Sequence, residues 1–224
     1  MSSSVALVHG FATTSARTWG ENGWVDLLKD VGRNPVLIDL LGHGTAERPH
    51  DPAAYAEMEA LVAAQLPERP VDAVGFSLGA RVLLTLAIED PGRFERLVLT
   101  GVGANLFHSE GSDLIVRAIE GDGDPANPVV QYFSGLADHP DTDRQALAAC
   151  LRSPRPVLTP ELVASVDIPV LVVIGDKDFA GPGEPLAEAL PNSTLVTLRN
   201  VDHFATPKDF GCIDAVLDFL GAAL

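Results

Sequence analysis

The chain has 224 residues and a formal net charge of −16 at pH 7, from 15 lysines and arginines against 31 aspartates and glutamates. This length, with 46% hydrophobic residues, fits one globular domain with a substantial core and excludes a disordered chain. Because so acidic a chain without a basic stripe repels phosphate backbones and anionic lipids, we expect neither a nucleic-acid partner nor a membrane partner.

The N-terminus and the two cysteines indicate the compartment. The first nine residues, MSSSVALVH, lack the basic residues and the apolar length of a signal peptide. No apolar run approaches the roughly 20 residues that span a bilayer. Cys150 and Cys212 form neither a metal pattern nor a disulfide framework, so we expect two unpaired thiols, with a single bridge as the alternative. The sequence therefore predicts a cytoplasmic protein with no metal and no other cofactor.

Short aliphatic runs recur along the chain, and most are followed by a longer segment of helical pattern. Strands are predicted at Val5–Val8, Pro35–Asp39, Val71–Val74, Arg96–Thr100, Pro169–Ile174 and Thr194–Leu198. Helices are predicted at Gly23–Val31, Pro52–Gln65, Leu78–Glu89, Gly183–Leu190 and Lys208–Leu220. Apolar strands that alternate with helices are typical of a parallel sheet covered on both faces. We therefore predict an α/β fold with an open, mostly parallel sheet of about six strands.

The alternation stops between Gly101 and Ile168. This segment contains helical patterns without a convincing strand, at Ser112–Ile119, Pro128–Leu136, Asp141–Leu151 and Pro160–Val166. We interpret residues 104–166 as a small helical cap inserted into a single domain of residues 1–224. The cap is expected to cover one end of the sheet and to set the substrate preference, which its sequence does not reveal.

A serine between two glycines joins the third predicted strand to the helix that follows. In Gly75-Phe-Ser-Leu-Gly79, a tight turn would expose the Ser77 oxygen, and glycines suit the points where strand and helix nearly touch. The turn also places the Leu78 amide at a helix N-terminus, directed toward the position where an oxyanion would form. A glycine-rich turn without catalysis is the alternative, and the strand before it and buried helix after it disfavour that reading.

A nucleophilic serine needs a base and a group that orients the base. Of six histidines, only His203 follows the last predicted strand, where the chain order serine, acid, histidine places the base. The loop Gly175-Asp-Lys-Asp178 follows the fifth strand and offers two carboxylates. We predict Asp178 as the acid because it lies deeper in the loop. Asp176 is the alternative, although an aspartate there commonly bonds the backbone of its turn.

The second oxyanion donor is expected after the first strand, in His9-Gly10-Phe11, as the backbone amide of Phe11. His9 is then expected to be structural. Apolar residues of the surrounding loops should form the walls of the substrate pocket, although a plain core role is an equal alternative for each. These predicted wall residues are Phe11, Phe76, Leu78, Val102, Phe107, Phe179 and Phe204.

Taken together, these segments resemble the α/β-hydrolase superfamily over nearly the whole chain outside the cap. The segments that carry the resemblance are His9-Gly10-Phe11, Asp39-Leu-Leu-Gly-His-Gly44, Gly75-Phe-Ser-Leu-Gly79, Pro169-Val-Leu-Val-Val-Ile-Gly-Asp-Lys-Asp178 and Asp202-His203. The resemblance implies an esterase-like serine hydrolase, with His43 as a structural residue that braces loops near the site. It also implies a Ser77–His203–Asp178 triad.

The chain departs from the family pattern in three places. It begins at the strand that precedes His9, so the family's antiparallel N-terminal strands are absent and an exposed sheet edge is expected, which a homodimer could cover. The cap is short, which suggests an accessible pocket. Asp202 precedes the base where the family more often has glycine, so the charge near His203 could differ.

We therefore predict a serine hydrolase that cleaves a small ester, thioester or related acyl substrate through an acyl-enzyme intermediate. One alternative keeps the triad but hydrolyses a carbon–carbon bond or acts as a cofactor-free lyase, which rests on family analogy. The other is a ligand-binding or sensing protein with little turnover. A serine at the turn disfavours the dehalogenase branch, which uses aspartate there.

Overall fold

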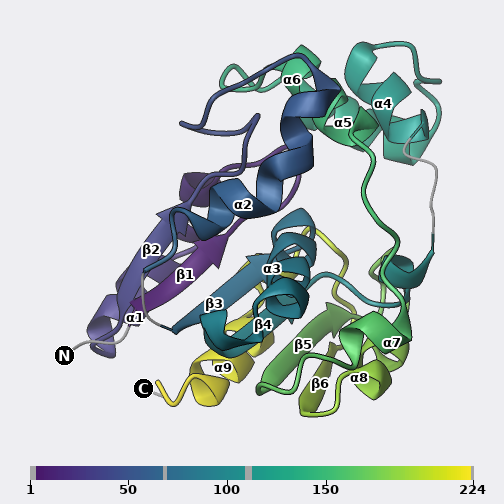
Figure 1. Ribbon diagram of the computed structural model, residues 1–224. Helices are drawn as coiled ribbons and strands as arrows, with labels where there is room; N and C mark the ends of the chain where they lie inside the picture. Colours follow the sequence, from purple (N-terminus) through teal and green to yellow (C-terminus); the bar gives the residue numbers. More distant parts are fainter. Residues whose placement is uncertain (1–3, 68–69, 109–112, 223–224) are drawn as a thin grey trace.

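The computed structural model describes residues 4–67, 70–108 and 113–222. Six strands form one sheet in the order β2-β1-β3-β4-β5-β6, and every neighbouring pair is parallel (Figure 1). The strands are β1 (Ser4–Val8), β2 (Asn34–Ile38), β3 (Val71–Phe76), β4 (Phe94–Thr100), β5 (Val170–Gly175) and β6 (Ser193–Leu198). The predicted sheet is confirmed, and its strand ends differ from the predicted ones by at most two residues.

The strand order reverses at β1, which lies between β2 and β3. The chain crosses from β1 to β2 on one side and returns to pair β3 on the other side of β1. In open parallel sheets, the loops that leave neighbouring strands at such a point diverge and open a crevice at the carboxyl edge. The loops that follow β1 and β3 therefore begin side by side at this edge.

Helices cover both faces of the sheet (Figure 1). The α-helices that do so are α1 (Trp24–Asp30), α2 (Met58–Ala63), α3 (Leu78–Glu89), α8 (Glu184–Ala189) and α9 (Phe210–Phe219). Short helical segments are η1 (Ala16–Gly20), η2 (Pro52–Glu57), η3 (Pro91–Arg93), η4 (Ala104–Phe107) and η5 (Thr206–Lys208). The predicted helix Pro52–Gln65 is thus a 3-10 segment followed by α2.

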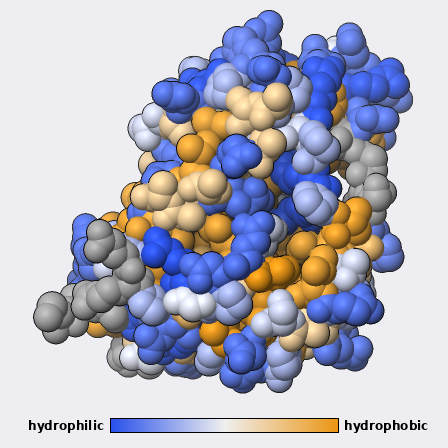
Figure 2. Space-filling view, viewed as in Figure 1, coloured by the Kyte–Doolittle hydropathy of each residue, from blue (hydrophilic) through white to orange (hydrophobic). Residues whose placement is uncertain are grey.

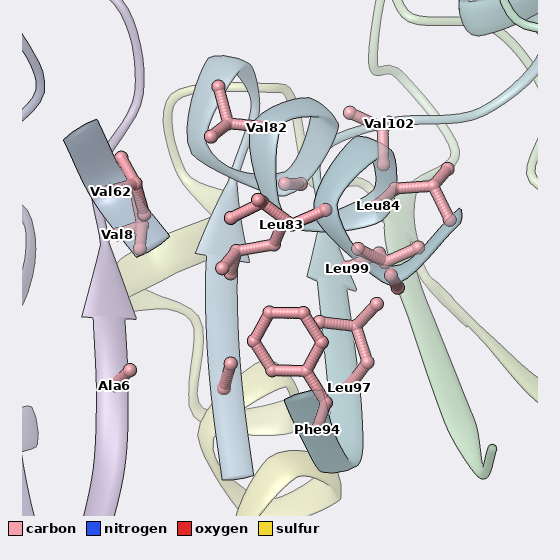
Figure 3. Close-up of a cluster of buried hydrophobic side chains, with 14 of the residues drawn as sticks. Ala6, Val8, Val62, Val82, Leu83, Leu84, Phe94, Leu97, Leu99 and Val102 are labelled. Atoms are coloured by element: carbon pink, nitrogen blue, oxygen red, sulfur yellow. The ribbon is translucent and has the colours of Figure 1, made fainter. Parts of the chain in front are cut away.

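Successive strand side chains alternate between two hydrophobic clusters. In β1, Ala6 and Val8 belong to one cluster, and Val5 and Leu7 belong to the other. Residues of α2, α3 and α8 complete the first cluster, whereas α1 and α9 complete the second. Figure 3 shows the first cluster, in which side chains of α2 and α3 meet those of the strands. Because both faces are covered, the strands read as continuous apolar runs.

The segment between β4 and β5 contains η4, α4 (Asp113–Glu120), α5 (Pro128–Ala137), α6 (Arg144–Arg152) and α7 (Pro160–Val163). The described part of this segment contains no strand. Residues 109–112 of the predicted cap lie outside the described residues, and they include Ser112, the first residue of the predicted helix Ser112–Ile119. Helices α4, α5 and α6 pack around a core of their own beyond the carboxyl edge of the sheet (Figure 1). By contrast, α7 contacts α3 and α8, in the layer that covers the sheet.

The surface differs between these two parts. Figure 2 shows that hydrophilic residues dominate the end formed by α4–α6, whereas hydrophobic residues show over α2 and near α7. Leu61, Val157 and Leu162 are among the exposed large hydrophobic residues there. Within residues 4–67, 70–108 and 113–222, no helix combines the length and apolar character needed to cross a membrane.

Candidate active site

Ser77 lies on the turn between β3 and α3, the strand-turn-helix context that the sequence predicts. Its backbone has φ of 52° and ψ of −112°, a region that residues with a side chain rarely occupy. A Cβ on Gly75 would lie 2.5 Å from the Ala80 Cα, and one on Gly79 would lie 2.4 Å from the Val8 carbonyl oxygen. Only glycine permits these approaches, so the two glycines let the turn close tightly around Ser77.

Ser77, His203 and Asp178 form a continuous chain of hydrogen bonds. The His203 Nε2 atom lies 3.0 Å from Ser77 Oγ, and its Nδ1 atom lies 2.9 and 3.0 Å from the two Asp178 oxygens. Both His203 and Asp178 are buried. Because a carboxylate only accepts, Nδ1 carries the proton, which leaves Nε2 to accept a hydrogen bond from the Ser77 hydroxyl. This tautomer is the one that can remove the serine proton.

The structure separates the two candidate acids. Asp178 Oδ1 also accepts a hydrogen bond from the Ala180 amide at 2.8 Å, so two donors hold the carboxylate. Asp176 is exposed and its Oδ1 accepts from the Asn200 amide at 2.7 Å. We expected Asp176 to bond its own turn, but it connects the loop after β5 to the turn after β6. Only Asp178 of the two contacts His203.

Aromatic rings surround the imidazole of His203. The rings of Phe76, Phe179 and Phe204 have their centroids 4.9, 4.2 and 5.2 Å from the imidazole centroid. The neighbouring carboxylate of Asp202 accepts hydrogen bonds from the amides of Phe204 and Ala205 at 3.0 and 2.9 Å. The departure from the family pattern at Asp202 therefore serves the turn that follows the base.

Phe11 and Leu78 are the residues whose backbone amides the sequence predicts as oxyanion donors. Both residues line one cavity together with Ser77. Leu78 is the first residue of α3, whose N-terminal amides have no partner within the helix. In the described part of the chain, neither amide donates to another protein atom. Two amides without a protein partner, at the cavity that Ser77 lines, suit a developing negative charge.

Two buried histidines support the loop that carries Phe11. His9 donates from Nδ1 to the Gly10 oxygen at 2.6 Å and accepts from the Leu40 amide at Nε2, 3.0 Å away. The ring centroid of His43 lies 5.3 Å from that of His9 and 5.6 Å from that of Phe11. Burial lowers the pKa of His9 to about 4 and that of His43 to about 3, so both are neutral at pH 7. Neither contacts Ser77, and both connect loops beside it.

A cavity of about 430 Å³ contains Ser77 and His203. All but one of the predicted wall residues line it, namely Phe11, Phe76, Leu78, Val102, Phe179 and Phe204. The exception is Phe107, which packs against the core while its neighbour Leu106 faces the cavity. The 3-10 segment η4 therefore directs Leu106 toward the cavity, where Phe107 was predicted. Within the described residues, no cluster of histidine, cysteine, aspartate or glutamate could hold a metal ion.

The sequence did not predict the parts of the cavity wall that come from α5 and η1, nor the arginines that line the cavity. Tyr132 of α5 stacks on Phe204 with ring centroids 3.5 Å apart, and Phe133 lies 6.2 Å from Phe11. Helix α5 thus contacts both the loop that carries His203 and the loop that carries Phe11. The adjacent aromatic pair in an otherwise small helix is the signal that could have identified it. The other wall residues not predicted are Thr13, Arg17, Thr18, Glu21, Asn22, Arg81, Asn105, Leu106, Ile115, Leu136, Leu151, Arg155, Pro207 and Lys208.

Comparisons with known proteins agree with this architecture. Residues 5–210 match the alpha/beta hydrolase family. The chain is 32% identical to pimeloyl-[acyl-carrier protein] methyl ester esterase of Neisseria meningitidis serogroup B, over 89% of this chain and 85% of that protein. It is also 32% identical to 2-hydroxy-6-oxo-2,4-heptadienoate hydrolase of Pseudomonas putida, over 50% of this chain and 42% of that protein.

Among solved structures, MenH from S. aureus shares the fold with a TM-score of 0.77 at 19% identity, covering 98% of this chain and 93% of that chain. The family match covers the sheet from the second residue of β1 to the end of β6, with the turn that carries Ser77 and the loops that carry Asp178 and His203. The chain therefore belongs to the alpha/beta hydrolase family.

Proposed function

We propose that this hydrolase is a serine esterase that cleaves a small ester, thioester or related acyl substrate through an acyl-enzyme on Ser77. The observation that carries the proposal is the unbroken hydrogen-bond chain from Asp178 through His203 to Ser77, whose oxygen borders a cavity. The relative from Neisseria meningitidis, which is named as a methyl ester esterase, supports ester chemistry. Helices α4–α6 act as a cap over the cavity.

The geometry suits a two-step acyl transfer. His203 Nε2 takes the Ser77 proton as Oγ attacks the carbonyl carbon, and Asp178 stabilises the imidazolium that results. The oxyanion accepts hydrogen bonds from the Phe11 and Leu78 amides, and the N-terminus of α3 adds a favourable dipole. His203 then protonates the departing alcohol or thiol. Water, activated by the same imidazole, releases the acid and regenerates Ser77.

A fluorophosphonate probe tests this proposal, because it reacts with an activated serine. We expect the probe to label the wild type and to leave Ser77→Ala unlabelled at equal concentration. Ser15, which is buried and lies outside the cavity, provides a matched control as Ser15→Ala. Absence of labelling in folded wild-type protein, verified by circular dichroism, would exclude an activated Ser77 and with it the esterase.

A second candidate function uses the same triad for hydrolysis of a carbon–carbon bond. The relative from Pseudomonas putida favours it, because that hydrolase is named for a hydroxy-oxo-dienoate and not for an ester. A cofactor-free lyase would need the same residues. The two candidates predict different preferred substrates. If the enzyme consumes a hydroxy-oxo-dienoate, followed by its absorbance, faster than it hydrolyses p-nitrophenyl esters, the result would favour carbon–carbon cleavage.

The setting of this activity is also part of the proposal. We place the enzyme in the cytoplasm, acting on a small molecule without a cofactor, and two buried free cysteines are in keeping with a reducing compartment. The outermost strands β2 and β6 each have one unpaired edge in the described sheet, and a homodimer could cover one of them. Sedimentation velocity tests the dimer, which a monomer at micromolar concentration would refute.

A further inference from the structure

A second hollow adjoins the catalytic cavity. It has a volume of about 870 Å³ and shares four wall residues with the catalytic cavity, namely Arg81, Asn105, Leu151 and Arg155. Arg81 lies on α3, and Arg155 lies on the segment that descends from α6 to α7 (Figure 1). Because the same side chains face both spaces, a ligand that extends from Ser77 toward the second hollow must pass along them.

The catalytic cavity concentrates positive charge in a strongly acidic protein. Its wall contains four lysines or arginines, Arg17, Arg81, Arg155 and Lys208, and one carboxylate, Glu21. The whole chain has 15 basic and 31 acidic residues, so the ratio is reversed at the cavity. A cleft lined by one sign of charge raises the local concentration of ligands of the opposite sign. This distribution points to an anionic ligand.

Arg81 and Arg155 have no carboxylate partner among the described residues. Arg81 Nη2 donates to the Pro156 oxygen, and Arg155 Nη2 donates to the oxygen and the sulfur of Cys150 at 2.9 and 3.2 Å. One nitrogen of each guanidinium is thus anchored, which fixes the side chain and leaves other N–H groups for a ligand.

At the lower end of the sheet, two partly buried arginines share one carboxylate. Arg33 and Arg96 both bind the carboxylate of Asp72. Arg81 is half-buried and forms no ion pair with a carboxylate; burial and the charge of Arg155 lower its pKa, and the more distant Glu59 only partly offsets them. Two neighbouring cations destabilise each other, and an anion bound between them would relieve this repulsion.

The position of these groups relates the anion to the reacting carbonyl. Arg81 begins the second turn of α3, and its backbone amide donates to the backbone carbonyl oxygen of Ser77 at 3.0 Å, so it lies one helical turn from that residue. Asn105 Oδ1 accepts from the Gly103 amide at 3.0 Å, which leaves its side-chain NH2 as a further donor on the same wall. The donors therefore lie on the wall between Ser77 and the second hollow.

We propose that Arg81 and Arg155, with the side-chain amide of Asn105, bind a carboxylate carried by the acyl chain of the substrate. The substrate class is then a half-ester of a dicarboxylic acid, with the ester at Ser77 and the free carboxylate at the arginines. A planar guanidinium matches a carboxylate in a two-pronged hydrogen-bonding arrangement, which a neutral acyl chain cannot use. This inference rests on the proposed esterase function for its kinetic readout.

The first test compares p-nitrophenyl half-esters of dicarboxylic acids, from succinate to suberate, with the same esters methylated at the distal carboxylate. We expect kcat/KM to favour the charged ester about tenfold at the best chain length, mainly through KM, since a hydrogen bond to a charged group carries roughly that factor. Arg81→Gln and Arg155→Gln should each reduce this charged-to-neutral ratio about tenfold. Arg199→Gln makes the same charge change at an exposed position that lines neither space, and should preserve the ratio.

The second test does not require turnover. Isothermal titration calorimetry of Ser77→Ala with the free dicarboxylates should detect binding that weakens with salt and is lost on adding Arg155→Gln. Arg81→Lys keeps the charge and should retain part of the affinity if Arg81→Gln proves unstable. Equal rates for charged and neutral esters, with no dicarboxylate binding, would overturn the subsite and leave the esterase intact. Dicarboxylate binding without hydrolysis of any ester would support the subsite and refute the esterase.

Discussion

The replacement of Asp178 by asparagine should reverse the tautomer of His203. Asp178 presents acceptors at 2.9 and 3.0 Å from Nδ1, and Oδ1 also accepts from the Ala180 amide at 2.8 Å. An asparagine that keeps its oxygen on the Ala180 side must place its NH2 group against the Nδ1 proton. The repulsion favours the tautomer with the proton on Nε2, which cannot accept the Ser77 proton.

The expected loss follows from the triad logic. An asparagine at the corresponding acid of a trypsin-type triad lowers kcat about 10⁴-fold with the geometry preserved. Here one acceptor remains beside Nδ1, so we expect a loss between about 10³ and 10⁴ in kcat/KM, or ~4 to 5.5 kcal/mol of transition-state stabilisation. The measurement is the initial rate of p-nitrophenyl acetate hydrolysis, with the melting temperature recorded for each variant.

Asp176→Asn is the matched control. Its amide oxygen can still accept from the Asn200 amide, so we expect less than a threefold change, of the size of a weak surface effect. A smaller loss for Asp178→Asn than for Asp176→Asn would refute the assignment of the acid. A loss below tenfold for Asp178→Asn in a fully folded protein would show that the hydrogen bond to Nδ1 does not set the tautomer during catalysis.

Three further predictions concern the turn, the cap and pH. Gly79→Ala would place a Cβ 2.4 Å from the Val8 carbonyl oxygen in β1. We therefore expect the free energy of unfolding in urea to fall by about 3 kcal/mol and labelling by the fluorophosphonate probe to be lost. A stable variant that is still labelled would contradict the tight turn. Tyr132→Ala removes the ring whose centroid lies 3.5 Å from that of Phe204, so KM for p-nitrophenyl esters should rise about fivefold while kcat is retained. Tyr132→Phe keeps the ring and should behave as wild type. A fall in kcat with unchanged KM would argue that Tyr132 is not a wall residue. Burial lowers the pKa of His43 from 6.5 to about 3, so between these two values the unfolded chain binds a proton at His43 that the folded protein does not. The free energy of unfolding should therefore fall by about 2 kcal/mol as the pH is lowered from 7 to 5. Urea unfolding of His43→Asn should show a shallower pH dependence than wild type, and the exposed His108→Asn should not; equal slopes in all three proteins would refute the buried neutral histidine.

The site residues that could be predicted from the sequence are those whose positions are determined by the order of the strands in the sheet. Ser77, Asp178 and His203 follow the carboxyl ends of β3, β5 and β6, and parallel strands bring their carboxyl ends to one edge of the sheet. Each also lies in a short motif whose local geometry is determined by neighbouring residues. This is why strand positions and motif spacing were sufficient to bring the three together in a prediction.

The cap residues lacked such a determinant. Tyr132 and Arg155 reach the cavity because α4, α5 and α6 pack around their own core and set the direction of the chain that leaves α6. A helical pattern fixes which face of a helix is apolar but not which loop that face meets. The same limit explains Phe107 and Leu106, because the 3-10 turn of η4 decides which of two adjacent apolar side chains faces the cavity.

Phe76 connects the separate parts of the site. A Cβ on Gly10 would lie 2.8 Å from the Phe76 ring, and one on Gly101 would lie 2.7 Å from the same ring and 3.3 Å from the His203 imidazole. The ring therefore fills the space between the loops that follow β1 and β4, directly beside the base. Because these two loops and the His203 imidazole all lie against one aromatic side chain, we expect a shift in either loop to move the imidazole relative to the serine oxygen. We infer that Phe76, together with Asp178, helps to hold the His203 imidazole at 3.0 Å from the Ser77 oxygen.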